Sequence, residues 1–269
     1  MRDVTFRCPH CHEPLLDDDA GVVCAQGHRF DRAREGYLHL VPSGRHRSRP
    51  AGDDEQMVHA RRAFFDRGHY RPLMDAVASL VADARPAHVL DAGCGEGSYL
   101  AAVTSVCDAA GWGIDVSKPA IRLAARRHPE HRYAVASSFV LPFADAALDV
   151  VTSVFAPRHF PELFRVLRAR GVAVVAAPGP DHLAGVRALV YDDPRPHDER
   201  AHVSGDGEPA PVRRERVRFE LDLDDPADVL HLLQMTPYWW HARPEQQAAA
   251  AARSLRTTVD VWLTVHARP

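Results

Sequence analysis

The fold of this chain is decided by the stretch Leu90-Asp-Ala-Gly-Cys-Gly-Glu-Gly97, which continues the apolar run at residues 87–91. Its three alternating glycines let the backbone turn sharply and approach a ligand closely, because glycine takes positive φ at little cost. The apolar segment 99–106 predicts a helix directly after the loop. A strand, a glycine loop and a helix in this order are typical of the ligand-binding edge of an open α/β sheet.

The same alternation continues on both sides of this loop. Two helices are expected between Asp54 and Leu80, before the first strand. The other expected strands are residues 111–115, 132–136, 148–154, 172–177, 216–222 and 257–266. The helices expected between them are residues 118–128, 161–167 and 226–235. This order predicts an α/β protein with a parallel, doubly wound sheet.

The glycine loop has an acidic partner in Asp115, 24 residues beyond Asp91 and at the end of the second strand. A carboxylate there can accept hydrogen bonds from ribose hydroxyls, which suits both NAD and S-adenosylmethionine. Gly93, Gly95 and Gly97 follow a Gly-x-Gly-x-Gly pattern, preceded by an acid that is placed to face an amino group. The pattern therefore favours S-adenosylmethionine over NAD, and a glycine-rich turn without a ligand is the remaining alternative.

A second constellation lies near the N-terminus, where Cys8, Cys11, Cys24 and His28 have the spacing Cys-x2-Cys-x12-Cys-x3-His. Thiolate and imidazole pairs on two short loops are the ligands of a closed, tetrahedral Zn²⁺ site. Buried thiols beside a surface histidine are the alternative, but they would not explain why three of five cysteines fall in this region. Four protein ligands leave no position for water, so the zinc is predicted to be structural.

Composition fits a globular protein of 269 residues with 46% hydrophobic residues. No run of 18 apolar residues and no apolar signal core occur, so we expect a cytoplasmic protein without membrane contact. Cys94 and Cys107 are expected to be reduced core residues.

The net charge of −3 argues against a uniformly basic surface, but the arginines are unevenly distributed. Between Arg29 and Arg71, ten arginines face six acids, an excess of four positive charges. The run predicts either a phosphate-binding patch or an ordinary solvated surface.

The chain resembles the bacterial 23S ribosomal RNA guanine-N1 methyltransferases over almost its whole length. The resemblance rests on the Cys/His quartet and glycine loop together with further segments: residues 30–37, 65–73, 113–121, 135–138, 154–157, 177–183 and 232–237. It implies a class I S-adenosylmethionine-dependent methyltransferase, with a Rossmann-like doubly wound sheet and a small N-terminal zinc-binding domain. The domains expected are a zinc-binding domain at 1–36, an Arg/Pro/Gly-rich linker at 37–58 and the methyltransferase domain at 59–269.

The resemblance also implies an activity and partners. The activity is methyl transfer to N1 of a guanine in a hairpin of domain II of 23S rRNA, by a homodimer whose zinc domains frame an RNA cleft. Cofactor contacts are implied for Tyr70, Gly97, Ser98 and His182, beside Asp91, Gly93, Gly95 and Asp115 of the motif. Family members usually carry an aromatic residue where this chain has Ser98. The family includes housekeeping and macrolide-resistance enzymes, and the sequence does not decide between these roles.

Guanine N1 is protonated at neutral pH, so methylation needs a proton acceptor or a stabiliser of the O6 anion. Candidates are His182, Asp181, His159 and Arg158, which follow the fourth and fifth strands. For His182 a cofactor contact is favoured over a role as base, and Arg158 and His159 could instead bind phosphate. An extruded base needs aromatic planes, which Phe155 and the run Tyr238-Trp-Trp240 could provide. Packing of the two tryptophans on the sheet is an equal alternative.

Two other functions stay open at this point. A methyltransferase for a small natural product would share the cofactor site but would not need the zinc quartet. A zinc-ribbon binding module with a vestigial cofactor fold is disfavoured by the intact glycine loop and Asp115. The polar segment 192–211 is either an RNA-facing loop or solvent-exposed filler.

Overall fold

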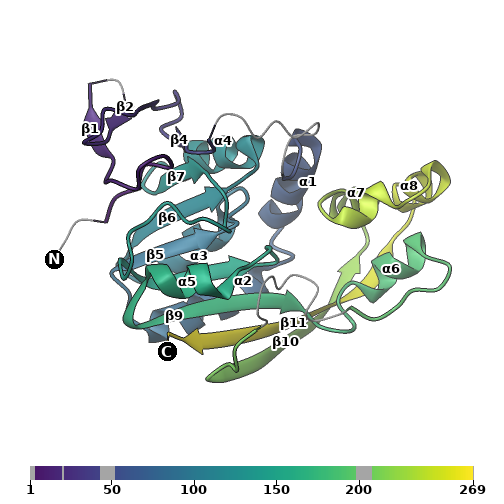
Figure 1. Ribbon diagram of the computed structural model, residues 1–269. Helices are drawn as coiled ribbons and strands as arrows, with labels where there is room; N and C mark the ends of the chain where they lie inside the picture. The colour runs from purple at the N-terminus through teal and green to yellow at the C-terminus, as the bar shows by residue number, and fades with distance from the viewer. Residues whose placement is uncertain (1–3, 20, 43–51, 198–207, 269) are drawn as a thin grey trace.

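An eight-stranded sheet forms the centre of the computed structural model, which describes residues 4–19, 21–42, 52–197 and 208–268 (Figure 1). Its strand order is β10-β11-β9-β8-β5-β6-β7-β4. The six strands from β9 to β4 are parallel to one another. At the β9 edge, β11 pairs antiparallel with β9, and β10 pairs antiparallel with β11. The strands are β4 (Leu38–His39), β5 (His88–Ala92), β6 (Ala110–Asp115), β7 (Arg132–Val135), β8 (Leu148–Val154), β9 (Leu167–Pro178), β10 (Arg213–Leu223) and β11 (Leu255–Ala267).

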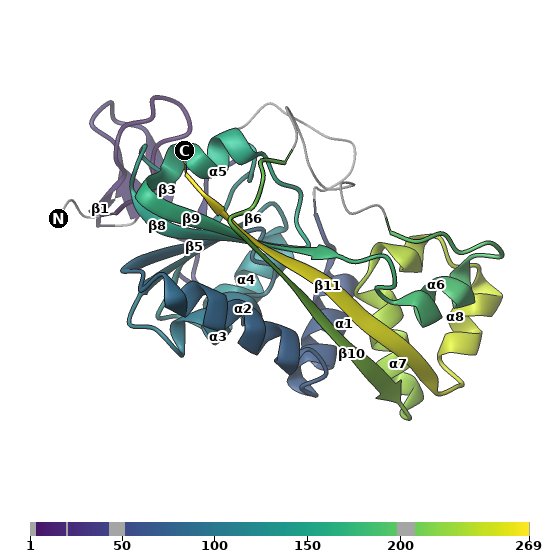
Figure 2. The same ribbon diagram turned by 90° about the horizontal axis from the view of Figure 1, so that it is seen from below.

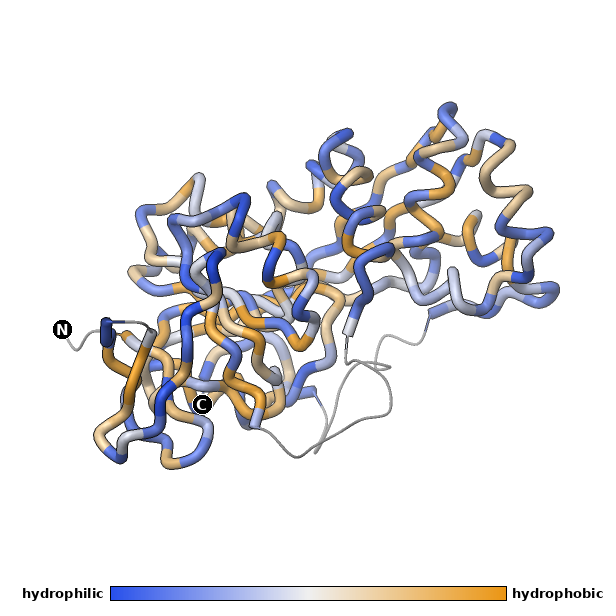
Figure 3. Tube along the Cα trace, turned by 90° about the horizontal axis from the view of Figure 1, so that it is seen from above, coloured by the Kyte–Doolittle hydropathy of each residue, from blue (hydrophilic) through white to orange (hydrophobic). Residues whose placement is uncertain are grey.

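Helices cover both faces of the sheet, as the alternating pattern predicts. On one face pack α1 (Glu55–Asp66), α2 (Arg71–Asp83), α3 (Ser98–Thr104) and α4 (Lys118–Arg127), and α5 (Phe160–Val166) lies on the other (Figure 2). Three helices gather beyond the ends of β9 and β10 and the start of β11: α6 (Ala184–Val190), α7 (Pro226–Gln234) and α8 (Pro244–Ala250) (Figure 1). A short 3₁₀ helix, η1 (Pro237–Trp240), follows α7. In the hydropathy view the strongly hydrophobic segments run through the middle of the molecule (Figure 3).

The N-terminal module, residues 4–37, contains the small antiparallel sheet β1 (Leu16–Asp18), β2 (Gly21–Val23) and β3 (Arg29–Asp31). It lies on the face of the large sheet that carries α5. Phe6 packs edge-on against Trp112, at 5.1 Å between ring centroids, and lies at a tilt against Phe143, at 5.2 Å. The main-chain N–H of Arg7 donates to the carbonyl of Pro142 at 2.8 Å. The module and the sheet therefore share one apolar core.

The strand immediately after this module belongs to the large sheet. Leu38 and His39 of β4 pair in parallel with Ala134 and Val135 of β7. β4 and the start of α1 lie within the segment 37–58 that we predicted as a linker, whereas residues 43–51 fall outside the described part of the chain. The chain thus contributes a sheet edge before it enters the first helix.

Most of the predicted elements are confirmed, with shifts at their ends. The strand predicted at 148–154 is β8, and the one predicted at 172–177 extends to Leu167–Pro178 as β9. Two short strands follow the second pair of predicted metal ligands, β3 at Arg29–Asp31 and β4 at Leu38–His39. β1, β2, α6 and α8 were not predicted from the sequence. Cys94 and Cys107 are both free thiols, as expected.

Candidate active site and metal centre

The four predicted metal ligands converge in the N-terminal module. One ligand atom from each of Cys8, Cys11, Cys24 and His28 lies within 4.8 Å of all the others. The sulfurs of Cys11 and Cys24 are 3.5 Å apart, and His28 Nδ1 is 3.3 Å from the sulfur of Cys24. Three thiolates and an imidazole converging on one point form a donor set that fits Zn²⁺ and leaves no open position. The centre is accordingly structural.

The glycine loop lies at the carboxyl end of β5 and leads into α3. Gly93, Gly95 and Gly97 have φ values of 91°, 54° and 90°. A Cβ on Gly93 would lie 2.4 Å from the Cβ of Ala156, which follows β8, and one on Gly97 would lie 2.8 Å from the hydroxyl of Tyr133. Glycine is needed here both for the backbone conformation and for the close approach of neighbouring segments.

Three carboxylates surround this loop. Asp91 is buried and accepts a hydrogen bond from the Thr152 hydroxyl at 2.8 Å. Burial, with the nearby charges of Asp115 and Glu96, raises the pKa of Asp91 to about 7. Burial also raises the pKa of Asp115, although this carboxylate accepts from the main-chain N–H groups of Ser117 at 2.8 Å and Gly95 at 3.0 Å. A concentration of negative charge at a glycine loop suits a cationic ligand.

Two arginines of α1 reach over the loop. Arg61 forms an ion pair with Asp53 at 2.6 Å and donates to the main-chain carbonyl of Met235 at 3.1 Å. Arg62 donates to the Ser98 hydroxyl at 3.1 Å, and that hydroxyl donates to Glu96 at 2.7 Å. The Ser98 side chain is therefore part of a polar network with Arg62 and Glu96.

Tyr70, at the start of α2, completes this side of the site. Its ring packs between Phe64 and Phe65 at centroid distances of 5.6 and 5.5 Å. Its hydroxyl is enclosed and has no hydrogen-bond partner among the described residues. Burial raises the pKa of this hydroxyl, so it stays protonated and can donate. An enclosed donor without a partner fits a position that a bound ligand would satisfy.

His182 lies in the turn between β9 and α6. The side chain is buried, and its ring stacks on Phe155 at 5.3 Å with an interplanar angle of 29°. Phe155 has the unusual φ of 53° and precedes Ala156, the residue that touches Gly93. A continuous set of contacts thus connects the glycine loop with His182. Burial, together with His197 and Arg187, lowers the pKa of His182 to about 3, so its imidazole is neutral at pH 7.

The other catalytic candidates have different surroundings. Asp181 is half exposed and accepts from Arg218 at 2.7 Å. The guanidinium of Arg158 is enclosed, 1% exposed, and faces Glu208 at 3.4 Å, which in turn pairs with His266. Nδ1 of His159, at the start of α5, is enclosed as well. The burial of Arg158 argues against a contact with RNA phosphate.

The aromatic residues 238–240 after α7 were considered either for packing on the sheet or for stacking on a base, and they differ in their surroundings. Tyr238 and Trp239 pack against the main core, and the Tyr238 hydroxyl bonds His197 Nε2 at 2.8 Å. Trp240 is 61% exposed. Packing accounts for Trp239, whereas Trp240 is free to stack on a base.

The predicted arginine patch is largely neutralised. Six of its ten arginines are ion-paired with carboxylates: Arg29, Arg32, Arg61, Arg62, Arg67 and Arg71. Arg34 is exposed, and Arg45, Arg47 and Arg49 lie outside the described residues. The excess positive charge counted in the sequence therefore overstates what this surface offers to RNA.

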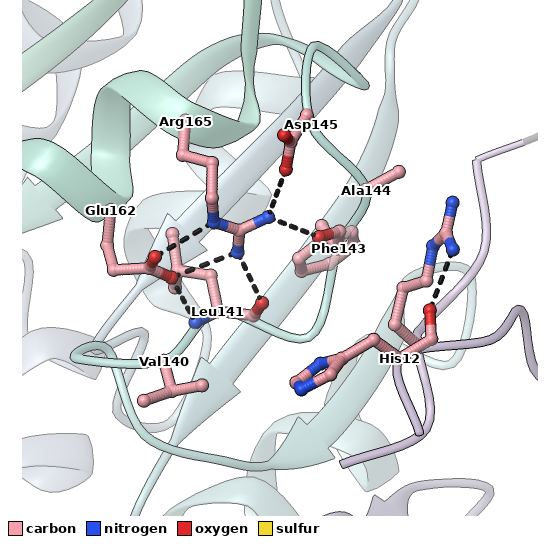
Figure 4. Close-up of a pocket in the computed structure, with 9 residues that line it drawn as sticks. His12, Val140, Leu141, Phe143, Ala144, Asp145, Glu162 and Arg165 are labelled. Carbon is pink, nitrogen blue, oxygen red and sulfur yellow. Dashed lines mark hydrogen bonds and ion pairs between the residues drawn. The ribbon is translucent and has the colours of Figure 1, made fainter. Parts of the chain in front are cut away.

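A cavity of about 510 Å³ lies between the N-terminal module and α5 (Figure 4). Arg165 lines it but is held by Glu162, Asp145 and the carbonyls of residues 141 and 143 (Figure 4). Its lining residues come from the module, the segment 140–145 and α5, and none belongs to the glycine loop. This cavity lies at the interface between the N-terminal module and the large sheet, apart from the candidate active site.

Sequence reasoning missed Asp260, Arg61 and Arg62. Asp260 is completely buried on β11 and contacts the turn that holds His182. The available signal was an acid between Val259 and Val261 in an otherwise apolar strand, since such an acid must be paired when buried.

Comparison with known proteins agrees with both modules. Residues 6–49 match the family model described as "RlmA, N-terminal", and residues 90–175 match "Methyltransferase domain". The chain is 40% identical over 258 residues to the 23S rRNA (guanine(748)-N(1))-methyltransferase of Streptomyces fradiae, covering 92% of this chain and 90% of that protein. The chain belongs to the 23S rRNA (guanine-N1)-methyltransferase family.

Two further family members are named as candidate enzymes of the same activity. The one from Micromonospora griseorubida is 38% identical and covers 92% of this chain and 90% of its own length. The one from Bacillus subtilis is 34% identical, and the match covers 97% of this chain and 96% of that protein. Membership of this methyltransferase family confirms the predicted fold class, the S-adenosylmethionine cofactor and the structural zinc. No helix among the described residues is long and apolar enough to cross a membrane.

Proposed function

We propose that this protein transfers a methyl group from S-adenosylmethionine to N1 of a guanine in a hairpin of domain II of 23S rRNA. The observation that carries the proposal is that similarity to enzymes named for this reaction extends over 92% of the chain, metal module and methyltransferase sheet together. A methyltransferase for a small molecule would leave the N-terminal module without a role.

The residues proposed to hold the methyl donor are Tyr70, Asp91, Gly93, Gly95, Gly97, Ser98, Asp115 and His182. When bound, S-adenosylmethionine supplies an electrophilic methyl group on a positively charged sulfur. Asp91 and Asp115 offer carboxylates to its amino and ribose groups, and the glycines allow close approach of the main chain. The negative charge of the surrounding acids offsets the positive charge of the donor.

The task of the remaining residues is positioning, because displacement at a methyl carbon requires the attacking nitrogen in line with the leaving sulfur. Phe155 lies at the carboxyl end of β8, beside the glycine loop, where its ring can hold an extruded base. Trp240 is exposed near the end of α7 and can stack on a neighbouring nucleotide. Among the catalytic candidates, Asp181 is the carboxylate proposed to receive the N1 proton. It directly precedes His182 in the sequence.

The proposal includes the organisation expected from the sequence. The chain consists of a zinc-binding domain at 1–36, with ligands Cys8, Cys11, Cys24 and His28, a linker at 37–58 that contributes β4 and the start of α1, and a methyltransferase domain at 59–269. It acts as a homodimer in the cytoplasm, where two zinc-binding domains frame the RNA.

Primer extension on 23S RNA from a methylation-deficient host tests this function, because N1 methylation blocks base pairing and stops the polymerase. We expect a new stop at one guanine when the gene is present. Gly93→Ala should abolish the stop, since its Cβ would meet Ala156 at 2.4 Å. Gly68→Ala is the matched control, because Gly68 also has positive φ, 80°, but no atom within 4 Å of an added Cβ. No new stop, with methyl transfer to a small metabolite instead, would contradict the proposal.

A further inference from the structure

One buried residue, Asp260 of β11, makes several hydrogen bonds to the turn that carries His182. The main-chain carbonyl of Asp260 accepts from the N–H of Gly179 at 2.7 Å, and its carboxylate accepts from the N–H of Asp181 at 3.0 Å. The main-chain N–H of Asp260 points at His182 Nδ1 at 3.3 Å. Three separate atoms of one residue thus fix the start, middle and end of the turn.

The carboxylate of Asp260 is itself held in place. Arg216 of β10 donates to both of its oxygens, at 2.7 and 2.9 Å. A Cβ on Gly179 would lie 2.6 Å from this carboxylate, so glycine is required for the turn to pack on it. Although burial opposes ionisation, the bonds from Arg216 and Asp181 keep the pKa of Asp260 below its ordinary value. The residue is a charged, fully bonded anchor.

The contact with His182 decides which ring nitrogen carries the proton. A main-chain N–H can only donate, so Nδ1 must be the unprotonated, accepting nitrogen. The proton of the neutral ring is then on Nε2. A ring protonated on Nδ1 would place two N–H groups against each other in a buried position, which costs about 1–3 kcal/mol.

The groups facing His182 also favour a neutral ring. Arg187, from α6, donates to the main-chain carbonyls of His182 and Pro180, and it brings a positive charge beside the imidazole. Phe155 covers one side of the ring, and His197 lies at 5.9 Å. The opposing influence is Asp260, whose charge is already matched by Arg216. In the described part of the chain Nε2 has no hydrogen-bond partner, and it is not among the fully enclosed polar atoms.

We propose that Asp260 is a positioning residue of the methyl-donor site, which holds His182 as a neutral imidazole protonated on Nε2 so that His182 donates a hydrogen bond to the bound donor. The inference rests on the proposed contact between His182 and S-adenosylmethionine. It also removes His182 from the candidates for the general base, because a ring already protonated on its free nitrogen has no lone pair with which to accept the N1 proton.

The first test is spectroscopic and needs no RNA substrate. Two-bond ¹H–¹⁵N spectra of the ¹⁵N-histidine-labelled protein report which ring nitrogen is protonated, and His182→Gln identifies the His182 signals. We expect the Nε2-protonated form with no titration between pH 5 and pH 8. A ring protonated on Nδ1, or one that titrates near pH 6.5, would overturn the proposal.

The second test measures donor affinity by calorimetry with S-adenosylmethionine. Asp260→Asn keeps the shape of the side chain but loses the charge pairing with Arg216, and we expect affinity to fall about tenfold. The effect should largely vanish in a His182→Gln background, because Asp260 acts through His182. The matched control is Asp222→Asn, which removes an exposed pair with Arg256 on the same two strands and should leave affinity unchanged.

The outcomes separate this inference from the proposed function. Equal donor affinity in Asp260→Asn and Asp222→Asn, or a full loss that persists in the His182→Gln background, would refute the positioning role while leaving methyl transfer to RNA intact. Normal donor binding with the expected histidine spectra, but no modified guanine, would refute the RNA substrate and leave the role of Asp260 standing.

Discussion

At the residue scale, the dominant feature is the concentration of carboxylates at the glycine loop. Asp91, Glu96 and Asp115 are brought together by the ends of two neighbouring strands, and the pKa of Asp91 is raised by its burial and by the other two. The site is therefore strained electrostatically without its ligand. Binding of a cationic donor relieves this strain by favouring the ionised form of Asp91.

This predicts a pH-dependent donor affinity. In the free protein Asp91 has a pKa of about 7, and a bound cation lowers it, so binding releases a proton below pH 7. Affinity for S-adenosylmethionine should rise by up to about tenfold per pH unit below pH 6, rise less steeply towards pH 7 and level off above pH 8. Calorimetry in buffers of different ionisation enthalpy counts the released protons. A flat profile in this range, or proton uptake, would show that Asp91 does not face the donor.

The residues that belong to a local sequence motif could be predicted from the sequence. Gly93, Gly95, Gly97 and Asp115 follow from the strand-loop-helix spacing, and the structure places them together. Asp260 could not be recognised as a partner of His182, because the two lie 78 positions apart and meet only through the register of β11 against β9. That register is a property of the folded sheet, which local pattern does not encode.

At the element scale, the N-terminal module takes the position of a covering layer on the sheet. The ring of Phe6 is its main apolar contact with Trp112 and Phe143. Phe6→Ala should lower the free energy of unfolding by about 3–5 kcal/mol, the usual range for a truncated buried phenylalanine. Leu16→Ala in the same module is the control, because Leu16 is 60% exposed and its truncation should change stability by less than about 0.5 kcal/mol. Urea denaturation of both variants measures the difference, and similar values for the two would mean that the module does not dock as described.

Loss of the metal should affect RNA binding more than donor binding. Cys24→Ser removes one of the four ligands and should release zinc, measured as metal content per chain. We expect RNA affinity to be lost and the melting temperature to fall, whereas donor affinity below that temperature stays within about twofold, since the donor residues lie outside the module. RNA affinity that survives the loss of zinc would exclude the module from RNA recognition.

The sequence predicted elements well where periodicity is strong and poorly where elements are short. The buried strand β8 matches its predicted range, and α4 is shorter by one residue. β1 and β2 have three residues each, so an alternating pattern of apolar and polar residues has no room to develop. α6 was missed because its start, at Leu183 with φ of 52°, carries no capping signal.

At the scale of the whole molecule, the net charge of −3 and the ion pairing of the arginines limit electrostatic RNA binding. If all ten arginines between Arg29 and Arg71 contacted phosphate, the logarithmic salt slope would be about −7. Because six of them are already paired with carboxylates, we expect a slope of about −3. Filter binding of a domain II hairpin between 50 and 300 mM salt measures it. A slope near −7 would mean that RNA displaces the internal carboxylate partners.

The apolar seam between Phe6 and the sheet also constrains how the polypeptide is made. Phe6 leaves the ribosome early, but its two aromatic neighbours, Trp112 and Phe143, are synthesised more than a hundred residues later. The emerging segment can bind its metal ion at once. Its apolar surface around Phe6, however, stays exposed until about half of the chain has been translated. The nascent protein is therefore most exposed to aggregation between those two moments.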